Sequence, residues 1–280
     1  MAEQKTSDET GLDSHYAFGD NWSEFARGLE EGRIENAVKE MSRLIHADEI
    51  AGRSFLDVGC GSGLSSLAAL RLGAGQVVAI DLDPASVATA GAVLGRFAKD
   101  RDWRLDEKSV FALAPDDMGR FDVVYSWGVL HHTGAMWRAI EACLPMVADG
   151  GIFALALYRK TPACAFWQKE KRFYSRAPRF LRAIVRGIYK LVFMANMLRG
   201  RRNPLEYIRT YGKYRGMSWH TDVEDWLGGY PYESVRPADL RAFLADRGFE
   251  EVRAFVTELP EGFWGILGSG CDEFVFRKSA

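Results

Sequence analysis

The sequence predicts an α/β fold, a doubly wound and mostly parallel seven-stranded sheet whose last strand is antiparallel. Between residues 54 and 158, short apolar segments alternate with helical patterns, which is the rhythm of parallel strands joined by helices. This rhythm breaks at Arg159 and returns at Pro237. The two apolar segments that close the chain are separated by the glycine-rich stretch 262–270, a length that suits a hairpin and therefore an antiparallel pair.

The predicted elements fall into four segments. Residues 1–48 are a tail and helices that cap the core, the clearest helix spanning 34–45. Residues 49–160 are the core, with strands expected at 54–58, 76–80, 103–105, 121–125 and 152–158 and helices at 64–72, 84–97 and 134–146. Residues 161–235 are a basic and aromatic insertion, expected to be helical and to act as a lid. Residues 236–280 return to the core with a helix at 237–247 and strands at 251–257 and 273–277.

Composition sets limits on the function. The 280 residues are 48% hydrophobic with a formal net charge of -2, so the chain can bury a substantial core and has no bulk attraction to polyanions. Residues 1–13 contain no apolar signal core, and the apolar stretch 183–198 is too short to span a membrane, so we expect a cytoplasmic protein. The four cysteines are widely spaced, which favours neither a disulfide framework nor a zinc site.

A glycine-rich turn follows the first predicted strand. Asp57 precedes three glycines in GxGxG spacing, Gly59, Gly61 and Gly63, and Asp81 closes the second strand. Ligands of open parallel sheets bind beyond the carboxyl ends of the strands, where both acids are expected. Dinucleotide sites use GxGxxG spacing, and an acid is poorly placed beside a pyrophosphate but suits a cation. The pattern favours a cationic cofactor over a nicotinamide or flavin dinucleotide, or over a turn that only packs a helix against a strand.

Residues 55–63 resemble motif I of the class I S-adenosylmethionine (SAM)-dependent methyltransferases. Residues 77–84 resemble the second motif of that family, residues 121–132 its fourth-strand motif, and residues 150–153 the start of its fifth strand. The four segments occur in the family's order, and the likeness is close over about residues 50–160. The chain is also similar to a subgroup of uncharacterised bacterial small-molecule methyltransferases. The resemblance implies SAM as the cofactor and an in-line transfer of its methyl group.

The resemblance also implies which residues hold SAM. We expect the methionine part beside Asp57, Gly59, Cys60 and Gly61, the ribose at Asp81, and the adenine against Leu82, Ser109 and Val110. Ser126 and Trp127 are expected near the sulfonium. Trp22 is expected either to close over the cofactor or to anchor the N-terminal helices.

Histidines are the candidate proton acceptors, because imidazole titrates near neutral pH. His131 and His132 follow the fourth strand, although either could instead cap the next helix. His220 with Asp222 or Asp225 is a second candidate, an oriented base in the aromatic stretch 215–233. No cluster of Asp, Glu and His demands a metal. The expected substrate contacts, each with a role as a structural anchor as its alternative, are Tyr158, Arg159, Trp219, Tyr230 and Tyr232.

The expected acceptor is a small molecule with an oxygen or sulfur nucleophile. An NAD(P)-dependent oxidoreductase and a non-catalytic SAM-binding scaffold or sensor are the alternatives. The segment from Arg159 to Arg202 carries 13 Lys/Arg and one acid, Glu170. This basic insertion has several interpretations: a lid with a solvated face, a site for an anionic substrate, a homodimer contact, or a peripheral membrane contact through an apolar stripe. Contact with nucleic acid is the least favoured, because the rest of the chain is acidic.

Overall fold

The computed structural model describes residues 26, 29–215, 218–259 and 262–280. The chain divides into two compact units. The larger unit, here called the sheet unit, comprises residues 17–160, 234–262 and 270–280. The smaller unit, here called the helical unit, comprises residues 1–16, 161–233 and 263–269.

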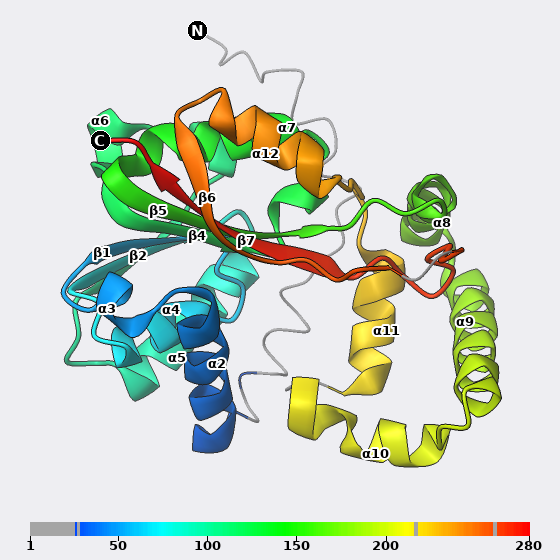
Figure 1. The fold of residues 1–280 in the computed structure, drawn as a ribbon. Helices are drawn as coiled ribbons and strands as arrows, with labels where there is room; N and C mark the ends of the chain where they lie inside the picture. The colour runs from blue at the N-terminus through cyan, green and yellow to red at the C-terminus, as the bar shows by residue number, and fades with distance from the viewer. Residues whose placement is uncertain (1–25, 27–28, 216–217, 260–261) are drawn as a thin grey trace, which may run out of the picture. The chain divides into compact units, whose positions relative to one another are not determined.

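The sheet unit contains a seven-stranded sheet of order β3-β2-β1-β4-β5-β7-β6 (Figure 1). Strands β1 to β5 pair in parallel, whereas β7 is antiparallel to both of its neighbours, β5 and β6. The predicted fold class is therefore confirmed. The strands are β1 (Ser54–Val58), β2 (Gln76–Asp81), β3 (Trp103–Glu107), β4 (Phe121–Trp127), β5 (Val147–Tyr158), β6 (Phe249–Phe255) and β7 (Cys271–Lys278).

Several strands are longer than their apolar segments predict. In β3 and β4 the pairing continues past the apolar residues, to Glu107 opposite Asp81 and to Trp127 opposite Ala156. The fifth strand begins at Val147 rather than at residue 152. Backbone hydrogen bonds extend a strand wherever a neighbour offers partners, and apolar periodicity does not record this. The extensions matter because they carry polar side chains to the carboxyl ends of the strands.

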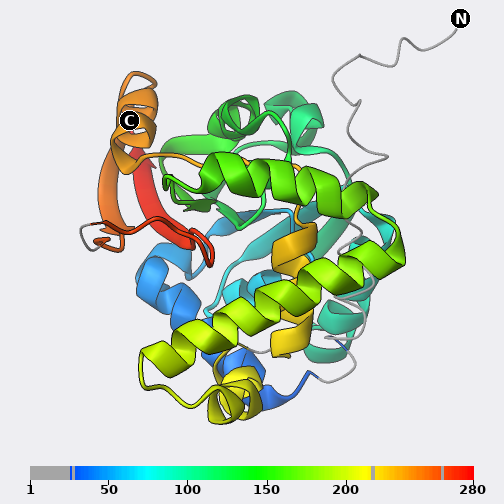
Figure 2. The same ribbon diagram turned by 90° about the vertical axis from the view of Figure 1, so that its right-hand side faces the viewer.

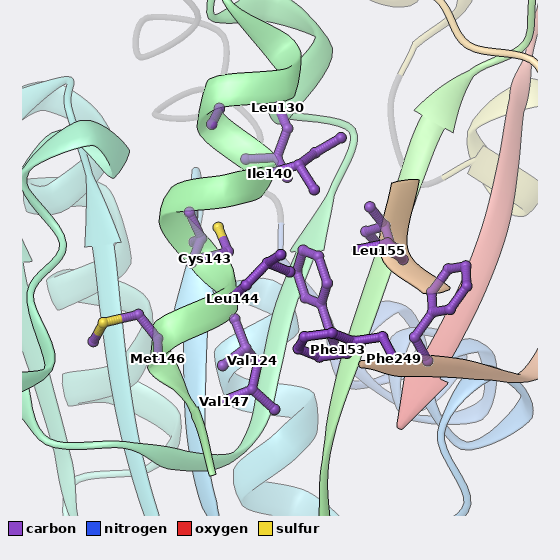
Figure 3. Packing of buried hydrophobic residues seen from close by; sticks show 14 of the residues in the cluster. Val124, Leu130, Ile140, Cys143, Leu144, Met146, Val147, Phe153, Leu155 and Phe249 are labelled. Atoms are coloured by element: carbon purple, nitrogen blue, oxygen red, sulfur yellow. The ribbon is translucent and has the colours of Figure 1, made fainter. Parts of the chain in front are cut away.

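Helices cover both faces of the sheet. On one face, α2 (Glu31–Leu44), α4 (Leu64–Arg71) and α5 (Pro84–Phe97) pack against Phe55 and Val123. On the other face, α7 (Met136–Cys143) and α12 (Pro237–Ala245) pack against β4 and β5, where Ile140 and Cys143 lie near Phe153 (Figure 3). Burial of these two apolar layers holds the strands in place. The sheet unit also contains the short helices α3 (Ala47–Ile50) and α6 (Pro115–Met118).

The helical unit contains the insertion, whose predicted helical character is confirmed. Its helices are α8 (Cys164–Arg176), α9 (Arg179–Arg199), α10 (Pro204–Arg215) and α11 (Trp219–Gly228). Residues 263–269, expected only to join two strands, belong to this unit as well. The Trp167 indole N–H donates to the Gly265 carbonyl at 2.7 Å, and the Tyr189 hydroxyl donates to the Leu267 carbonyl at 3.0 Å. None of the described helices is long and apolar enough to cross a membrane.

A buried ion pair fastens the end of β5 to β7. The Arg159 Nε lies 2.9 Å and 3.0 Å from the two carboxylate oxygens of Asp272, and a terminal guanidinium nitrogen makes a further short contact. Both side chains are buried. Arg159 was expected to contact substrate, but its guanidinium is instead bonded to Asp272 inside the sheet unit.

Asp272→Ala is expected to lower the free energy of unfolding by about 3–5 kcal/mol, because it leaves the Arg159 guanidinium buried without its carboxylate. The matched control is Glu251→Ala, which breaks the more exposed pair with Arg241 and should cost about 0–1 kcal/mol. Urea unfolding followed by circular dichroism measures both values. Equal losses in the two variants would contradict this account of the Arg159–Asp272 pair.

Candidate active site

The glycine turn joins the carboxyl end of β1 to α4. The Gly59 and Cys60 backbone N–H groups both donate to the Ile80 carbonyl, at 2.9 Å and 3.0 Å, which ties the turn to the end of β2. Gly59 has a φ of 79°, and a Cβ atom there would lie 2.4 Å from Val129 Cγ1. Only glycine fits both the backbone conformation and the contact with the loop after β4.

Asp57 lies at the carboxyl end of β1 with an exposed fraction of only 2%. Its Oδ2 accepts a hydrogen bond of 2.6 Å from the Ser66 hydroxyl on α4. Burial raises the pKa of Asp57 to about 7, the Ser66 hydrogen bond opposes this, and the neighbouring Asp81 adds to it. Among the residues that the structure describes, the groups that act on this carboxyl group include no cation. A buried acid without a cationic partner is suited to a ligand that brings positive charge.

Asp81 ends β2 and faces the same turn. Its Oδ2 accepts from the Gly61 N–H at 2.9 Å, and its Oδ1 accepts from the Asp83 N–H at 3.0 Å. Burial raises the pKa of Asp81, while these backbone hydrogen bonds oppose the shift. Each carboxylate oxygen has a second lone pair, so Asp81 can still accept hydrogen bonds from two vicinal hydroxyl groups.

Three apolar or capping residues lie beyond β2 and β3. Leu82 is 45% exposed, which leaves its side chain available to an apolar ring. Val110 begins a short 3₁₀ turn and packs against the core of the α7 face. The Ser109 hydroxyl accepts from the Phe111 N–H at 3.3 Å and so caps this turn. The end of β3 is held to β2 because the Lys108 N–H donates to the Asp81 carbonyl at 2.9 Å.

The end of β4 holds two residues that were expected near a sulfonium. The buried Ser126 hydroxyl donates to the Val58 carbonyl at 2.9 Å, so it joins β4 to β1. The exposed Trp127 donates its indole N–H to Glu273 on β7 at 2.8 Å, and Glu273 also pairs with Arg43 of α2 at 2.5 Å. Ser126 therefore stabilises the pairing of β4 with β1, whereas the Trp127 ring lies at the carboxyl edge of the sheet.

The two adjacent histidines occupy different environments. His131 is fully buried, and its Nδ1 accepts from the Tyr158 backbone N–H at 3.3 Å. The half-buried His132 ring lies edge-on to the Tyr158 ring, with centroids 5.3 Å apart. Of the pair, His132 is the one with access to a ligand at this edge.

The predicted base in the helical unit is not assembled as a dyad. His220 and Asp222 are two residues apart on α11, a spacing that points side chains in different directions. The His220 Nδ1 lies 2.8 Å from the Lys190 Nζ, and the Asp222 carboxylate accepts a short hydrogen bond from the Tyr211 hydroxyl. Partial burial and the cations Lys190 and Arg186 lower the pKa of His220, which weakens it as a proton acceptor.

The aromatic residues expected to contact substrate mostly form the core of the helical unit. Trp219 is buried against Phe193, with ring centroids 5.7 Å apart. Tyr232 is buried with its hydroxyl 3.3 Å from Cys164 Sγ. Lys171 is also buried there, with its Nζ 3.7 Å from the centroid of the Trp226 ring, and burial lowers its pKa to about 7. The half-buried Tyr230 follows α11. Trp219 and Tyr232 thus serve as anchors.

Most of the expected cofactor residues come together at the carboxyl edge of the sheet unit. Trp22 lies outside the described residues, and Cys60 is buried behind the turn against Ala79 and Ala90. The sequence did not reveal Ser66, Val129 or Glu273 as parts of this edge. Ser66 follows the glycine turn by three residues. Its place in the first turn of the helix after the turn was a local signal that its hydroxyl could contact the end of β1. The edge offers a buried acid, a second acid for hydroxyl groups and an exposed leucine, which fits the ammonium, ribose and adenine of SAM.

Known proteins resemble this chain in sequence and in fold. A family model described as a methyltransferase domain matches residues 56–153. A ubiquinone biosynthesis O-methyltransferase of Xanthomonas euvesicatoria is 40% identical over 115 residues, which are 41% of this chain and 47% of that protein. Its counterpart in Xanthomonas campestris is 34% identical over 155 residues, 55% of this chain and 63% of that protein. The chain thus matches less than two thirds of the length of these relatives.

Solved structures share the fold at low identity. Magnesium protoporphyrin IX methyltransferase from Synechocystis, solved with bound SAH, has a TM-score of 0.57 and 16% identity over 98% of this chain and all of that one. The 1,6-didemethyltoxoflavin-N1-methyltransferase of Burkholderia thailandensis has a TM-score of 0.52 and 15% identity over all of this chain and 94% of that one. Residues 56–153 thus match a methyltransferase domain, and the fold of the chain is the class I fold of SAM-dependent methyltransferases.

Proposed function

We propose that the chain transfers the methyl group of SAM to an oxygen or sulfur atom of a small-molecule acceptor. The observation that carries the proposal is the buried Asp57 carboxyl group at the end of β1 in a methyltransferase domain, a group that no cation among the described residues neutralises. A pyrophosphate would add negative charge beside Asp57 and Asp81, whereas SAM brings an ammonium and a sulfonium.

The cofactor residues have distinct proposed roles. Asp57 pairs with the ammonium of SAM, the backbone of Gly59 and Gly61 lies against its methionine part, and Asp81 accepts hydrogen bonds from the ribose hydroxyls. Leu82 and Val110 contact the adenine. The Trp127 ring forms the wall of the cofactor site beside β4. When bound, SAM supplies a methyl group on a sulfonium that departs as a neutral thioether. The chain contributes alignment of the acceptor and exclusion of water.

His132 is the proposed proton acceptor for a hydroxyl or thiol. It lies at the carboxyl end of β4 beside Tyr158, in the unit that holds the cofactor residues. His131 is left out of this role because its ring is fully buried and its Nδ1 already accepts a hydrogen bond. His220 is left out because the adjacent ammonium of Lys190 opposes its protonation.

Oxygen is the favoured acceptor atom. The relatives with 34% and 40% identity are named O-methyltransferases of ubiquinone biosynthesis. The methyltransferase domain model covers the glycine turn. Phenols and polyprenyl quinol precursors are therefore the first acceptors to examine. A cytoplasmic location stays part of this proposal.

The direct test incubates the protein with methyl-labelled SAM and a panel of phenols, polyprenyl quinol precursors, sugars, carboxylates and thiols. The proposal expects labelled product and one equivalent of SAH for each methyl group transferred to oxygen or sulfur. SAH binding without transfer across the panel would favour the scaffold or sensor. Binding of NADH without binding of SAH would favour the oxidoreductase.

The affinity for SAH is expected to rise roughly tenfold between pH 6 and pH 7.5. The pKa of Asp57 is raised to about 7 in the free protein, so the carboxyl group must lose its proton before it can attract the SAH ammonium. Calorimetric titration across this range measures the effect. Asp57→Asn should flatten the profile, and the exposed Asp100→Asn should leave it unchanged. A flat wild-type profile would reject the ammonium assignment.

Asp81→Ala should weaken SAH binding by about 1–3 kcal/mol, because the ribose hydroxyls lose a charged acceptor. The exposed Asp116→Ala is the matched control and should bind like the wild type. Thermal melting of each variant separates a lost ligand contact from a damaged fold. Wild-type affinity in a folded Asp81→Ala protein would remove Asp81 from the ribose site.

His132→Gln is expected to reduce turnover by about 10²–10⁴-fold while SAH affinity stays near the wild-type value, because glutamine cannot accept the acceptor's proton. His220→Gln, its matched control in the helical unit, should keep turnover within a few-fold of wild type. The comparison uses the best acceptor of the panel at saturating SAM. Full turnover by the His132 variant would show that it is not the base.

A further inference from the structure

The outer face of α9 exposes a stripe of large apolar side chains. Their exposed fractions lie between 53% and 66%. At about 100° per residue, the five positions fall within an arc of roughly 80° on one side of the helix. These residues, here called the α9 stripe, are Phe180, Ile184, Ile188, Leu191 and Leu198.

Other apolar side chains of the helical unit are exposed as well. Phe166 and Phe173 are exposed on α8, and Trp264 and Ile266 are exposed in the segment 263–269. Within this unit, α9 crosses α11 (Figure 2). Isolated exposed apolar residues are ordinary, but a continuous helical stripe of five is typical of a surface that meets a partner.

The cations of α9 are divided between its two sides. On the inner side, Arg186 pairs with Glu224, and Lys190 lies 2.8 Å from His220 Nδ1 on α11. By the same helical geometry Arg199 lies about 20° beyond Ile188, at one border of the stripe, whereas Arg179 lies about 100° from Phe180, on the side of Arg186 and Lys190. Arg199 is exposed and forms no ion pair with any residue that the structure describes. The stripe is thus bordered on one side by a cation that no described acid neutralises.

Two further cations follow the C-terminal end of α9. Arg201 and Arg202 are exposed and, like Arg199, form no ion pair with a described residue. A basic amphipathic helix places its apolar side at the boundary between headgroups and acyl chains, where its cations meet anionic headgroups. Arginine stems also allow the charged groups to reach the headgroups while the stripe is buried.

A second copy of this chain fits the surface poorly. A two-fold interface would bring the same patch of both copies together, and the unneutralised cations would then face one another. Nucleic acid would match the charge but would leave the five apolar side chains without an apolar partner. An anionic lipid surface satisfies both the apolar stripe and its basic border.

We propose that the α9 stripe, with Arg199, Arg201 and Arg202 at its C-terminal end, docks the protein on the surface of an anionic lipid bilayer, with α9 lying in the plane of the interface. A helix of 21 residues is about 31 Å long, so α9 would present its stripe over that length of the surface. The contact is peripheral, because none of the described helices can cross the membrane.

The test is flotation of the full chain with vesicles of phosphatidylcholine alone or of equal parts phosphatidylglycerol and phosphatidylcholine. The protein should float with the anionic vesicles, should stay at the bottom with the neutral ones, and should be released by raised salt. Ile184→Gln/Ile188→Gln/Leu191→Gln is expected to weaken binding by about tenfold or more, because three apolar side chains are lost from the bilayer contact. Arg199→Glu/Arg202→Glu should do the same through charge.

The controls are Val252→Gln on β6 and the exposed Lys99→Glu, which change apolar character and charge in the sheet unit and should float like the wild type. Circular dichroism and SAH binding of each variant report on the fold. Absence of flotation with anionic vesicles, or equal flotation with neutral ones, would overturn the proposal. Flotation of the glutamine variant at the wild-type level would also overturn it. A protein that dimerises through the α9 stripe and does not float with anionic vesicles would overturn it as well.

Discussion

The Asp57 carboxyl group is buried at the carboxyl end of β1 and accepts a 2.6 Å hydrogen bond from Ser66. The negative charge of the nearby Asp81 opposes the ionisation of Asp57. Burying an acid without a cation is costly, and the cost falls when a ligand supplies positive charge. The glycine turn leaves the backbone open beside this acid, and both neighbours of β1 in the sheet pair with it in parallel. This parallel pairing brings the carboxyl ends of β2 and β4, with Asp81 and Trp127, to the same edge of the sheet as Asp57.

Much of the sheet unit was predictable from local patterns. The apolar segment 54–58, the glycine spacing and the acid at residue 81 are all local signals, and they specify the strand, the turn and the ligand edge. Partners far apart in the sequence were not predictable. Asp272 lies 113 residues from Arg159, and Glu273 lies 146 residues from Trp127. Both depend on the antiparallel register of β7 on β5, which no local pattern specifies.

The aromatic stretch after residue 215 shows why composition alone misassigned several side chains. Tryptophan and tyrosine suit a substrate surface and a small core equally well, because each has a large apolar ring and one polar group. In the helical unit they surround the buried Lys171, whose Nζ lies 3.7 Å from the Trp226 ring centroid. The side of this unit that departs from ordinary packing is the outer face of α9, where apolar residues are exposed beside Arg199, which forms no ion pair with a described residue.

The central claim is that the carboxyl edge of the sheet unit takes a cationic cofactor rather than a dinucleotide. Calorimetric titration of the wild-type chain at pH 7.5 with SAH and with NADH, each also in competition with the other, tests it most directly. The account predicts saturable one-to-one binding of SAH in the micromolar range, unaffected by an excess of NADH. Binding of NADH that SAH cannot displace, with no heat from SAH itself, would contradict it.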